Sequence, residues 1–427
     1  MKTYFLNDLS ETEINNLTRR TAIELEKITS VVKPILKDIK KNGIHAVIKY
    51  AKQFDGFESD RLLVSKQEFD EAEQFLVPKI KNAILTAAQN IKNFHLKQLP
   101  VPYSIETMTG VNCSREFRAI ENVGLYIPGG SAVLPSTMLM LGIPATLAGC
   151  KRIVVCSPSK NSKINAPLLY TAKLCGINEF YKIGGAQAIG LLAYGGKDIP
   201  KVNKIFGPGN QYITAAKLLV SIEASGCSID MPAGPSEVLV VADGFANPSF
   251  VAADLLSQAE HGVDSQVVLI TNSAEHAKKI IAQINIQIAK LPRREIASKA
   301  LGNSFALVVN DIEQAINFSN MYAPEHLILN VENPEKLISK IVNAGSVFLG
   351  QYSPVSVGDY ASGTNHSLPT YGYAKVFGGV TVEMFMKSLT FQNLTKEGLS
   401  NISETVETLA EVESLLAHKN AVGIRLK

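Results

Sequence analysis

The sequence contains no tryptophan, no long apolar run and no excess of charge of either sign. Its 42 basic and 39 acidic residues give a formal net charge of +3, so the electrostatics indicate neither nucleic acid nor an anionic membrane as a partner. A bilayer span needs roughly 20 apolar residues, and no segment approaches that length. The N-terminal sequence MKTYFLND lacks the apolar core of a signal peptide. We therefore expect no membrane and no nucleic-acid partner.

Cysteine is also scarce. The five cysteines (Cys113, Cys150, Cys156, Cys175 and Cys227) are odd in number and show no C-x-x-C spacing. Both features argue against a disulfide framework and against a cysteine-based zinc site. The expected location is the reducing cytoplasm.

Length and composition describe a globular protein of more than one domain. A chain of 427 residues suggests two or three domains, and 46% hydrophobic with 19% charged residues supplies ample core. Residues 1–105 are expected to form a helical N-terminal region. Ser10 with Glu13, and Ser65 with Glu68, have the capping-box spacing that begins a helix.

Further along, short apolar runs alternate with helical patterns, which predicts an α/β fold with parallel sheets and crossover helices. One group of expected strands is 123–127, 152–156, 180–183 and 204–206; the other is 238–242, 266–271, 305–309, 327–330 and 346–349. Helices are expected over 274–289 and 334–342. The Pro- and Gly-rich segment 231–235 separates the groups, so we predict one domain over 106–235 and a second over 236–380.

The sheet pattern ends near residue 380. Residues 395–401 are polar and predict a turn, and Ser403 is the expected cap of a helix that follows. Residues 381–427 are too few to carry a core of their own. This tail must therefore pack on its own chain or on a partner subunit.

Three glycine-rich turns follow predicted strands of the first domain: PGGS at 128–131, GGAQAIG at 184–190 and GPGN at 207–210. None matches the G-x-G-x-x-G dinucleotide fingerprint. Glycine at a strand-to-helix turn still lets backbone N–H groups approach a phosphate, and open α/β sheets bind ligands at the carboxyl edge of their strands. Three such turns in one domain favour a cofactor cleft over ordinary loops.

Two proton-handling groups stand side by side at Glu325 and His326, behind a proline and before the apolar run 327–329. Their reference pKa values differ. A reaction that needs one acceptor for an alcohol proton and another for a water proton could use such a pair. An adjacent Glu-His pair also arises by chance on a surface, so its neighbours must decide.

Candidate metal ligands lie nearby in the sequence. Gln258 and His261 are three residues apart and share one helix face, Asp359 and His366 flank a Gly- and Ser-rich loop, and His418 lies in the tail. Imidazole, carboxylate and amide oxygen together suit Zn²⁺ better than Mg²⁺. No spacing among them is diagnostic, so a metal site and ordinary structural roles both stay open at this point.

Taken together, these segments resemble the histidinol dehydrogenase family. The matching blocks are IDMPAGPSE (229–237), QAEHG (258–262), APEHL (323–327), AHKNA (417–421), GLYIPGG (124–130) and GGAQAI (184–189). Each block is moderately specific, whereas their joint occurrence in order over nearly the whole chain is very specific. The resemblance implies two Rossmann-like parallel-sheet domains with small helical N-terminal and C-terminal parts, in a homodimer with shared active sites.

The resemblance also implies a reaction. The family oxidises L-histidinol to L-histidine through an aldehyde-level intermediate while two NAD⁺ are reduced, the last step of histidine biosynthesis. By that resemblance Glu325 and His326 are the acid/base residues, and the NAD contacts are Tyr126, Gln187 and Asn210. The expected Zn²⁺ ligands are Gln258, His261, Asp359 and His418. These four, together with Ser236, His326 and Glu413, would hold the substrate, with Glu413 and His418 reaching the partner's active site.

Other interpretations stay open. One is a paralogous zinc- and NAD-dependent dehydrogenase acting on another polar alcohol, against which Glu413 and His418 argue. Another is a non-catalytic nucleotide- or metal-binding protein that kept the fold, against which the intact Glu325 and His326 argue. A cysteine-dependent aldehyde dehydrogenase is a weaker alternative. His366 has no assigned role, and both support of Asp359 or His418 and plain loop structure fit it.

Overall fold

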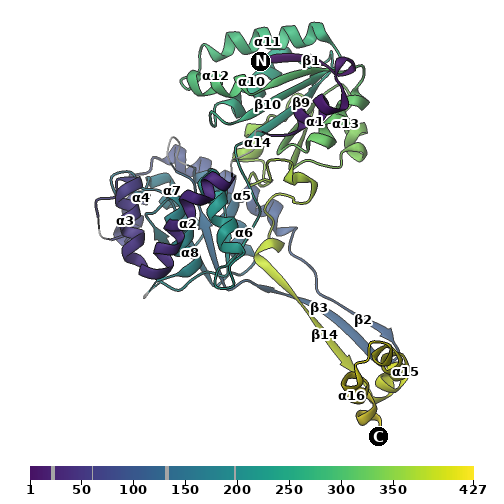
Figure 1. Cartoon of the computed structure of the whole chain (residues 1–427). Helices are drawn as coiled ribbons and strands as arrows, with labels where there is room; N and C mark the ends of the chain where they lie inside the picture. The colour runs from purple at the N-terminus through teal and green to yellow at the C-terminus, as the bar shows by residue number, and fades with distance from the viewer. Residues whose placement is uncertain (21–24, 60, 130–133, 197–198) are drawn as a thin grey trace.

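The structure is a computed structural model of residues 1–427, and it describes the chain apart from residues 21–24, 60, 130–133 and 197–198. Two α/β lobes lie side by side, and a long arm leads from them to a pair of C-terminal helices (Figure 1). Among the described residues, no helix combines the length and the apolar character that a bilayer crossing requires.

The first lobe is built on a five-stranded parallel sheet with strand order β6-β5-β4-β7-β8. Its strands are β4 (Asn122–Tyr126), β5 (Arg152–Cys156), β6 (Glu179–Tyr181), β7 (Lys204–Phe206) and β8 (Ser228–Ile229). Along β5, Val154 and Val155 belong to different apolar clusters, so both faces of the sheet are buried. One face is covered by α4 (Lys66–Phe75), α5 (Pro78–Leu96), α6 (Pro135–Leu147) and α7 (Ala166–Leu174). The other face is covered by α2 (Leu25–Asn42), α3 (Ile44–Asp55), α8 (Gly185–Tyr194) and α9 (Gln211–Ser221).

The second lobe contains a six-stranded parallel sheet with strand order β1-β11-β10-β9-β12-β13. Its strands are β1 (Lys2–Phe5), β9 (Glu237–Ala242), β10 (Gln266–Thr271), β11 (Phe305–Val308), β12 (His326–Asn330) and β13 (Ser346–Leu349). Helices α10 (Pro248–Ala259), α11 (Ala274–Ile288), α12 (Arg294–Gly302) and α14 (Val355–Tyr360) lie on one face, and α1 (Glu11–Thr18) and α13 (Ile312–Tyr322) on the other. Along β9, Val240 packs in the first cluster and Leu239 in the second.

The arm is an antiparallel sheet of order β14-β3-β2. It consists of β2 (Tyr103–Met108), β3 (Val111–Ala119) and β14 (Met386–Leu394), and it carries α15 (Lys396–Val412) and α16 (Leu416–Leu426) at its end. The remaining short 3-10 helices are η1 (Leu6–Asp8), η2 (Pro334–Lys340), η3 (Tyr373–Lys375) and η4 (Glu383–Phe385).

The predicted α/β class with two parallel sheets is confirmed. Three local predictions were wrong. Residues 395–401 are not a turn, because Thr395 caps α15 by accepting a hydrogen bond from the Gly398 N–H at 2.9 Å, and Ser403 lies inside that helix. The segment after residue 380 does contain a strand, β14. The expected helix over 334–342 is the 3-10 helix η2.

The two lobes meet through opposite edges of their sheets. Residues 230–236 lead from the carboxyl end of β8 to the amino end of β9. A second link is the hydrogen bond at 3.0 Å between Thr137, in the first turn of α6, and His366 of the second lobe. The carboxyl edge of the first sheet therefore lies beside the amino edge of the second.

Candidate active site

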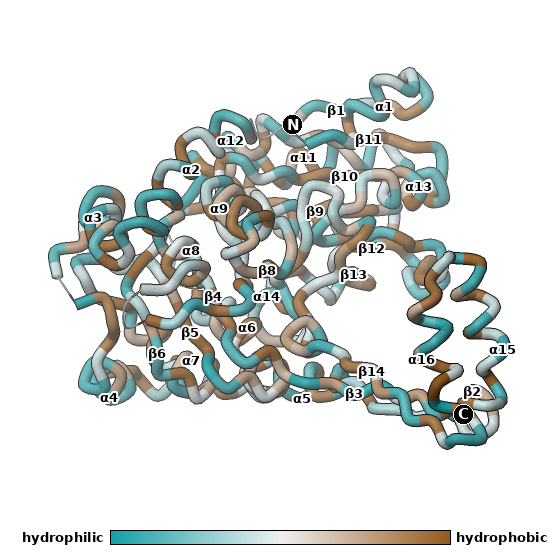
Figure 2. The backbone as a smooth tube through the Cα atoms, turned by 60° about the horizontal axis from the view of Figure 1, so that its bottom comes forward, coloured by the Kyte–Doolittle hydropathy of each residue, from teal (hydrophilic) through white to brown (hydrophobic). Residues whose placement is uncertain are grey.

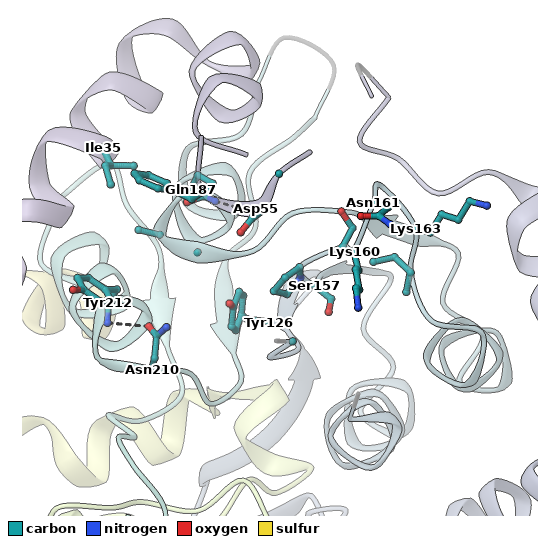
Figure 3. A pocket seen from close by; sticks show the side chains of 18 of the residues that line it. Ile35, Asp55, Tyr126, Ser157, Lys160, Asn161, Lys163, Gln187, Asn210 and Tyr212 are labelled. Carbon is teal, nitrogen blue, oxygen red and sulfur yellow. Dashed lines mark hydrogen bonds between the residues drawn. The ribbon is translucent and has the colours of Figure 1, made fainter. Parts of the chain in front are cut away.

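A cavity of about 1010 Å³ lies at the carboxyl edge of the first sheet. Its walls come from α2, from the end of α3 and from the turns that follow β4, β5, β6 and β7 (Figure 3). A cavity of this size can hold a dinucleotide and not only a small metabolite. Its position is the one at which open α/β sheets bind ligands.

Tyr126, Gln187 and Asn210, the residues expected to contact NAD, lie together on the wall of this cavity (Figure 3). Tyr126 ends β4 and is buried. The Gln187 amide, in the first turn of α8, donates to Asp55 Oδ2 at 3.0 Å. Asn210 caps α9, and its Oδ1 accepts from the Tyr212 N–H at 3.0 Å. Two helix amino ends, which favour anionic groups, thus face the same cavity.

The glycine-rich turns bring backbone close to this wall. Gly207 has a φ of +123°, and a Cβ there would lie 2.1 Å from the carbonyl oxygen of Tyr126. Only glycine satisfies both conditions. In the turn after β4, Gly129 lines the cavity, whereas Gly130 and Ser131 lie outside the described residues.

Glu325 and His326 lie at the amino edge of the second sheet, where β12 begins. They are 6% and 3% exposed. Glu325 Oε2 accepts the backbone N–H of Glu237 at 2.8 Å and lies 3.4 Å from His326 Nδ1. His326 Nδ1 lies 3.0 Å from the Glu237 carbonyl oxygen, which can only accept, so this nitrogen carries a proton. In the neutral ring, Nε2 is therefore the atom that can take a proton from a ligand.

Electrostatics couple the two groups. Burial raises the pKa of the Glu325 carboxyl, and the neighbouring His326 opposes that rise without cancelling it. Burial disfavours the charged form of His326, but the carboxylates of Glu325 and Asp359 outweigh burial and raise its pKa. A cation bound at Asp359 would weaken this pull on the imidazole. Buried groups with shifted pKa values that share a partner are suited to proton exchange with a substrate.

Three of the four expected zinc ligands lie near His326. Gln258 is in the last turn of α10, His261 follows that helix and is exposed in the single chain, and Asp359 is on α14, with its Oδ1 3.5 Å from His326 Nε2. The Gln258 Oε1 is buried and has no hydrogen-bond partner among the described residues. The charges of Asp359 and His326 act on the His261 ring, which places these three groups near one another. The unpaired amide oxygen of Gln258 on α10 and the carboxylate of Asp359 on α14, a helix that contacts α10, are donors of the kind that zinc accepts.

Glu413 and His418 do not join these residues within one chain. Both are exposed, Glu413 at the end of α15 and His418 in α16, and these helices lie at the end of the arm, away from the lobes (Figure 1). In the part of the chain that the structure describes, no three His, Cys, Asp or Glu side chains are grouped so as to hold a metal.

Ser236 and His366 flank the same group. Ser236 is half-buried and directly precedes β9. His366 Nδ1 donates to the Asp359 carbonyl oxygen at 2.7 Å, and its Nε2 accepts from the Thr137 hydroxyl. Burial lowers the pKa of His366, so the ring is neutral and can make both contacts. His366 thus ties α6 of the first lobe to the backbone of Asp359.

Comparison with known proteins agrees with this geometry. The family model described as histidinol dehydrogenase matches residues 18–426. The chain belongs to the histidinol dehydrogenase family. It is 50% identical over 428 residues to the histidinol dehydrogenase of Photobacterium profundum, covering 100% of this chain and 96% of that protein.

Two further relatives extend the match. The crystal structure of histidinol dehydrogenase from Elizabethkingia anophelis has a TM-score of 0.95 and 51% identity, with 100% of this chain and 98% of that chain covered. A putative histidine biosynthesis bifunctional protein HisCD of Photorhabdus laumondii is 51% identical over 413 residues. That match covers 96% of this chain, and this chain spans 51% of that longer protein.

Histidinol dehydrogenases perform the last step of histidine biosynthesis and depend on NAD and zinc. The family, the oxidoreductase activity and the two cofactors predicted from the sequence motifs are therefore confirmed.

Two acidic residues that contact the candidate site residues were not predicted from the sequence. Asp55 accepts a hydrogen bond from the Gln187 side-chain amide, and the backbone N–H of Glu237 donates one to the Glu325 carboxyl. Each left a signal. Asp55 ends α3, where the helix dipole disfavours an acidic residue. Glu237 is the one charged residue in the buried strand EVLVVA.

The cysteines do not support a thiol mechanism. Burial raises the pKa of Cys150, Cys175 and Cys227 to about 12 and raises that of Cys156 as well. Cys150 precedes Lys151, but that ammonium pairs with Glu121 at 2.8 Å. Thiols that stay protonated at neutral pH are poor nucleophiles. These four cysteines therefore argue against the cysteine-dependent alternative.

Proposed function

We propose that this chain oxidises L-histidinol to L-histidine at one site, with Glu325 and His326 as its proton acceptors. The observation that carries the proposal is the convergence of this buried pair with three candidate zinc ligands at one sheet edge, beside the cavity of the other sheet. NAD⁺ bound in that cavity would accept a hydride in each oxidation. Zinc would be held by Gln258, His261, Asp359 and a tail residue, His418, and would orient the imidazole and amine of the substrate.

In the first oxidation, His326 takes the proton of the substrate hydroxyl. A hydride leaves the carbon that bears this hydroxyl and passes to NAD⁺, and the aldehyde forms. The acceptor is Nε2, because Nδ1 is committed to the Glu237 carbonyl. In the second, Glu325 takes a proton from the water that adds to the aldehyde. The aldehyde oxygen takes the proton that His326 had accepted in the first oxidation, which completes the hydrate. The hydrate then loses a hydride from carbon to the second NAD⁺ and a proton from oxygen to His326, and the acid forms. The raised pKa of Glu325 makes it a stronger base than a solvated carboxylate.

We also propose a homodimer with shared active sites. The tail, residues 381–427, carries Glu413 and His418 on helices that lie away from both lobes, and it would pack on the partner. Residues 106–235 would bind NAD together with α2 and the end of α3, which also line the cavity, and residues 236–380 would carry the acid/base and metal residues. Ser236 and Glu413 would help to hold the substrate. Apolar segments on α15 and α16 lack cover in the single chain (Figure 2). Exposed apolar residues on them include Leu409, Val412, Leu416 and Ile424. Such a surface needs a partner, and a second copy would bring the missing zinc ligand with it.

The expected compartment is the cytoplasm. All five cysteines are free thiols. Free thiols persist in a reducing compartment, where disulfides are rare.

The test measures NADH formed from limiting L-histidinol in excess NAD⁺, before and after a chelator removes metal. We expect about two NADH per histidinol, since each oxidation step reduces one NAD⁺, with activity lost without metal and regained with Zn²⁺. No NADH from a folded, zinc-loaded dimer would refute the assignment. It would favour the paralogous dehydrogenase, and other polar alcohols would then be screened.

A further inference from the structure

Arg20 lies between α1, which packs on the second sheet, and α2, which packs on the first lobe. Its side chain is only 7% exposed and forms a two-point ion pair with the buried Glu237. Arg20 Nε lies 2.9 Å from Glu237 Oε1, and Nη2 lies 2.7 Å from Oε2. A planar guanidinium that meets both oxygens of a carboxylate fixes its partner's orientation, which a lysine cannot do.

The same guanidinium also contacts residues 322 and 323, which directly precede the Pro324-Glu325-His326 segment. Nη1 donates to the Tyr322 carbonyl oxygen at 2.5 Å, Nη2 donates to that of Ala323 at 3.3 Å, and the group stacks 3.5 Å from the Tyr322 ring centroid. Ala323 ends α13 with a φ of +52°, a left-handed conformation that costs free energy in a non-glycine residue. Arg20 therefore holds a strained turn that lies two residues before Glu325.

Glu237 connects Arg20 to both members of the pair. Its carboxylate is held by Arg20 and by the Tyr371 N–H at 2.8 Å. Its backbone N–H donates to Glu325, and its backbone carbonyl accepts from His326. One residue thus has its side chain fixed by Arg20 and its backbone bonded to both proton acceptors.

We propose that Arg20 is a positioning residue for the oxidation chemistry. It acts through Glu237 and through the turn at Ala323, which together set the place of Glu325 and His326. This inference rests on the acid/base roles proposed above. The segment that connects α1 to α2 would then contribute to catalysis, although Arg20 is 217 positions away from Glu237 in the sequence.

Arg20→Lys tests the inference, because it keeps a positive charge beside Glu237 and removes the two-point geometry. We expect kcat with L-histidinol to fall about 10- to 100-fold, the cost of small misplacements of reacting groups, with KM for NAD⁺ within about twofold of the unsubstituted enzyme. Zinc content and the dimer should be unchanged. The matched control is Arg152→Lys, which breaks the two-point pair between Arg152 and Glu179 at the starts of β5 and β6, on the sheet edge opposite the cavity. The control should keep its kcat.

A double-mutant cycle separates positioning from general support of the fold. If Arg20 acts through Glu325, Arg20→Lys should cost less than about threefold in the aldehyde oxidation of a Glu325→Gln enzyme. Losses that multiply, or a normal kcat in Arg20→Lys alone, would overturn the inference. If Arg20→Lys does not fold, the pair Arg20→Met with Glu237→Gln removes both buried charges at once, and it should show the same loss of kcat. Full activity of Glu325→Gln alone would instead refute the proposed acid/base roles.

Discussion

Replacing Glu325 with glutamine tests which group activates water. Glu325 is buried, and its Oε2 accepts the Glu237 N–H at 2.8 Å. The oxygen of a glutamine amide can accept the same bond in nearly the same volume, so the side chain should stay in place. The variant loses the ability to take a proton and keeps the packing.

The two half-reactions should respond differently. Proton transfer by one positioned group contributes about 10²- to 10⁴-fold, or about 2.7–5.4 kcal/mol, and we expect a loss in this range for the aldehyde oxidation. Oxidation of the alcohol uses His326, whose Nδ1 keeps its 3.0 Å contact with the Glu237 carbonyl. That half-reaction should slow by less than about tenfold.

The thermal stability of Glu325→Gln independently checks that burial raises the pKa of Glu325. Burial raises the pKa of Glu325. Its ionisation therefore costs the folded state stability as the pH rises from the ordinary carboxyl pKa through the raised one. Glutamine removes this cost, so the melting temperature of Glu325→Gln at neutral pH should not fall. A lower melting temperature would mean that the substitution had damaged the packing.

The assay presents L-histidinol and the corresponding aldehyde separately, at saturating NAD⁺, and follows NADH in a single turnover. Glu275→Gln, an exposed carboxylate on α11 that pairs with Lys279, is the control and should leave both rates unchanged. Equal slowing of both half-reactions by Glu325→Gln would refute the water-activating role. Loss of zinc from the variant would refute the assumption that the site stays intact.

His418→Ala should lose both zinc and activity, because it removes the ligand that the lobes lack; full metal occupancy would overturn that assignment. Mixing inactive His326→Ala and inactive His418→Ala proteins should restore about a quarter of the activity, because half of the dimers are mixed and each has one intact site. No recovery despite demonstrated heterodimers would exclude a shared site. Asp55→Ala removes the acceptor of the Gln187 amide and should raise KM for NAD⁺ about 3- to 10-fold. The control is Asp70→Ala, an exposed carboxylate; equal KM values in the two variants would contradict the role of Asp55.

The strands of the two lobes could be predicted because parallel strands buried on both faces are nearly continuous apolar runs. β5, β7, β10 and β13 have the predicted bounds. The strand β14, MKSLTFQNL, is mixed in polarity and largely exposed, so its own residues do not mark it. It is stabilised by pairing with β3, far away in the sequence. β1 also went unpredicted, and it pairs with β11 across most of the chain.

The start of α15 was misread for a different reason. The polarity of residues 395–401 predicts a turn, and Gly398 within them is compatible with one. In the structure Gly398 is buried in the first turn of the helix, and a Cβ there would lie 2.1 Å from the Gly110 carbonyl oxygen. The glycine serves the close approach of α15 to the β2–β3 turn. A tertiary contact of this kind cannot be distinguished from a turn signal in one sequence.

The site was predictable only where chemistry-bearing residues stand in recognisable blocks. Glu325 and His326 are adjacent, and Gln258 and His261 are only three residues apart, although the helix that carries Gln258 ends at Ala259 before it reaches His261. Arg20 stands alone, and its partner Glu237 is 217 positions further along the chain. No local pattern predicts such a pair, because only the packing of α1 on the second sheet brings the two together.

The meeting of opposite sheet edges explains how one site can serve two oxidations. The cofactor cavity belongs to the carboxyl edge of the first sheet, whereas Glu325, His326 and the candidate metal ligands of the lobes belong to the amino edge of the second. Two hydride transfers to NAD⁺ require a used cofactor to leave while the reactive aldehyde stays bound. On the proposed assignment the two sets of contacts lie on different sheets, so NAD would be exchanged without moving the groups that hold the substrate. The hydrogen bond of 3.0 Å between His366 and Thr137 links the two edges independently of either set of contacts.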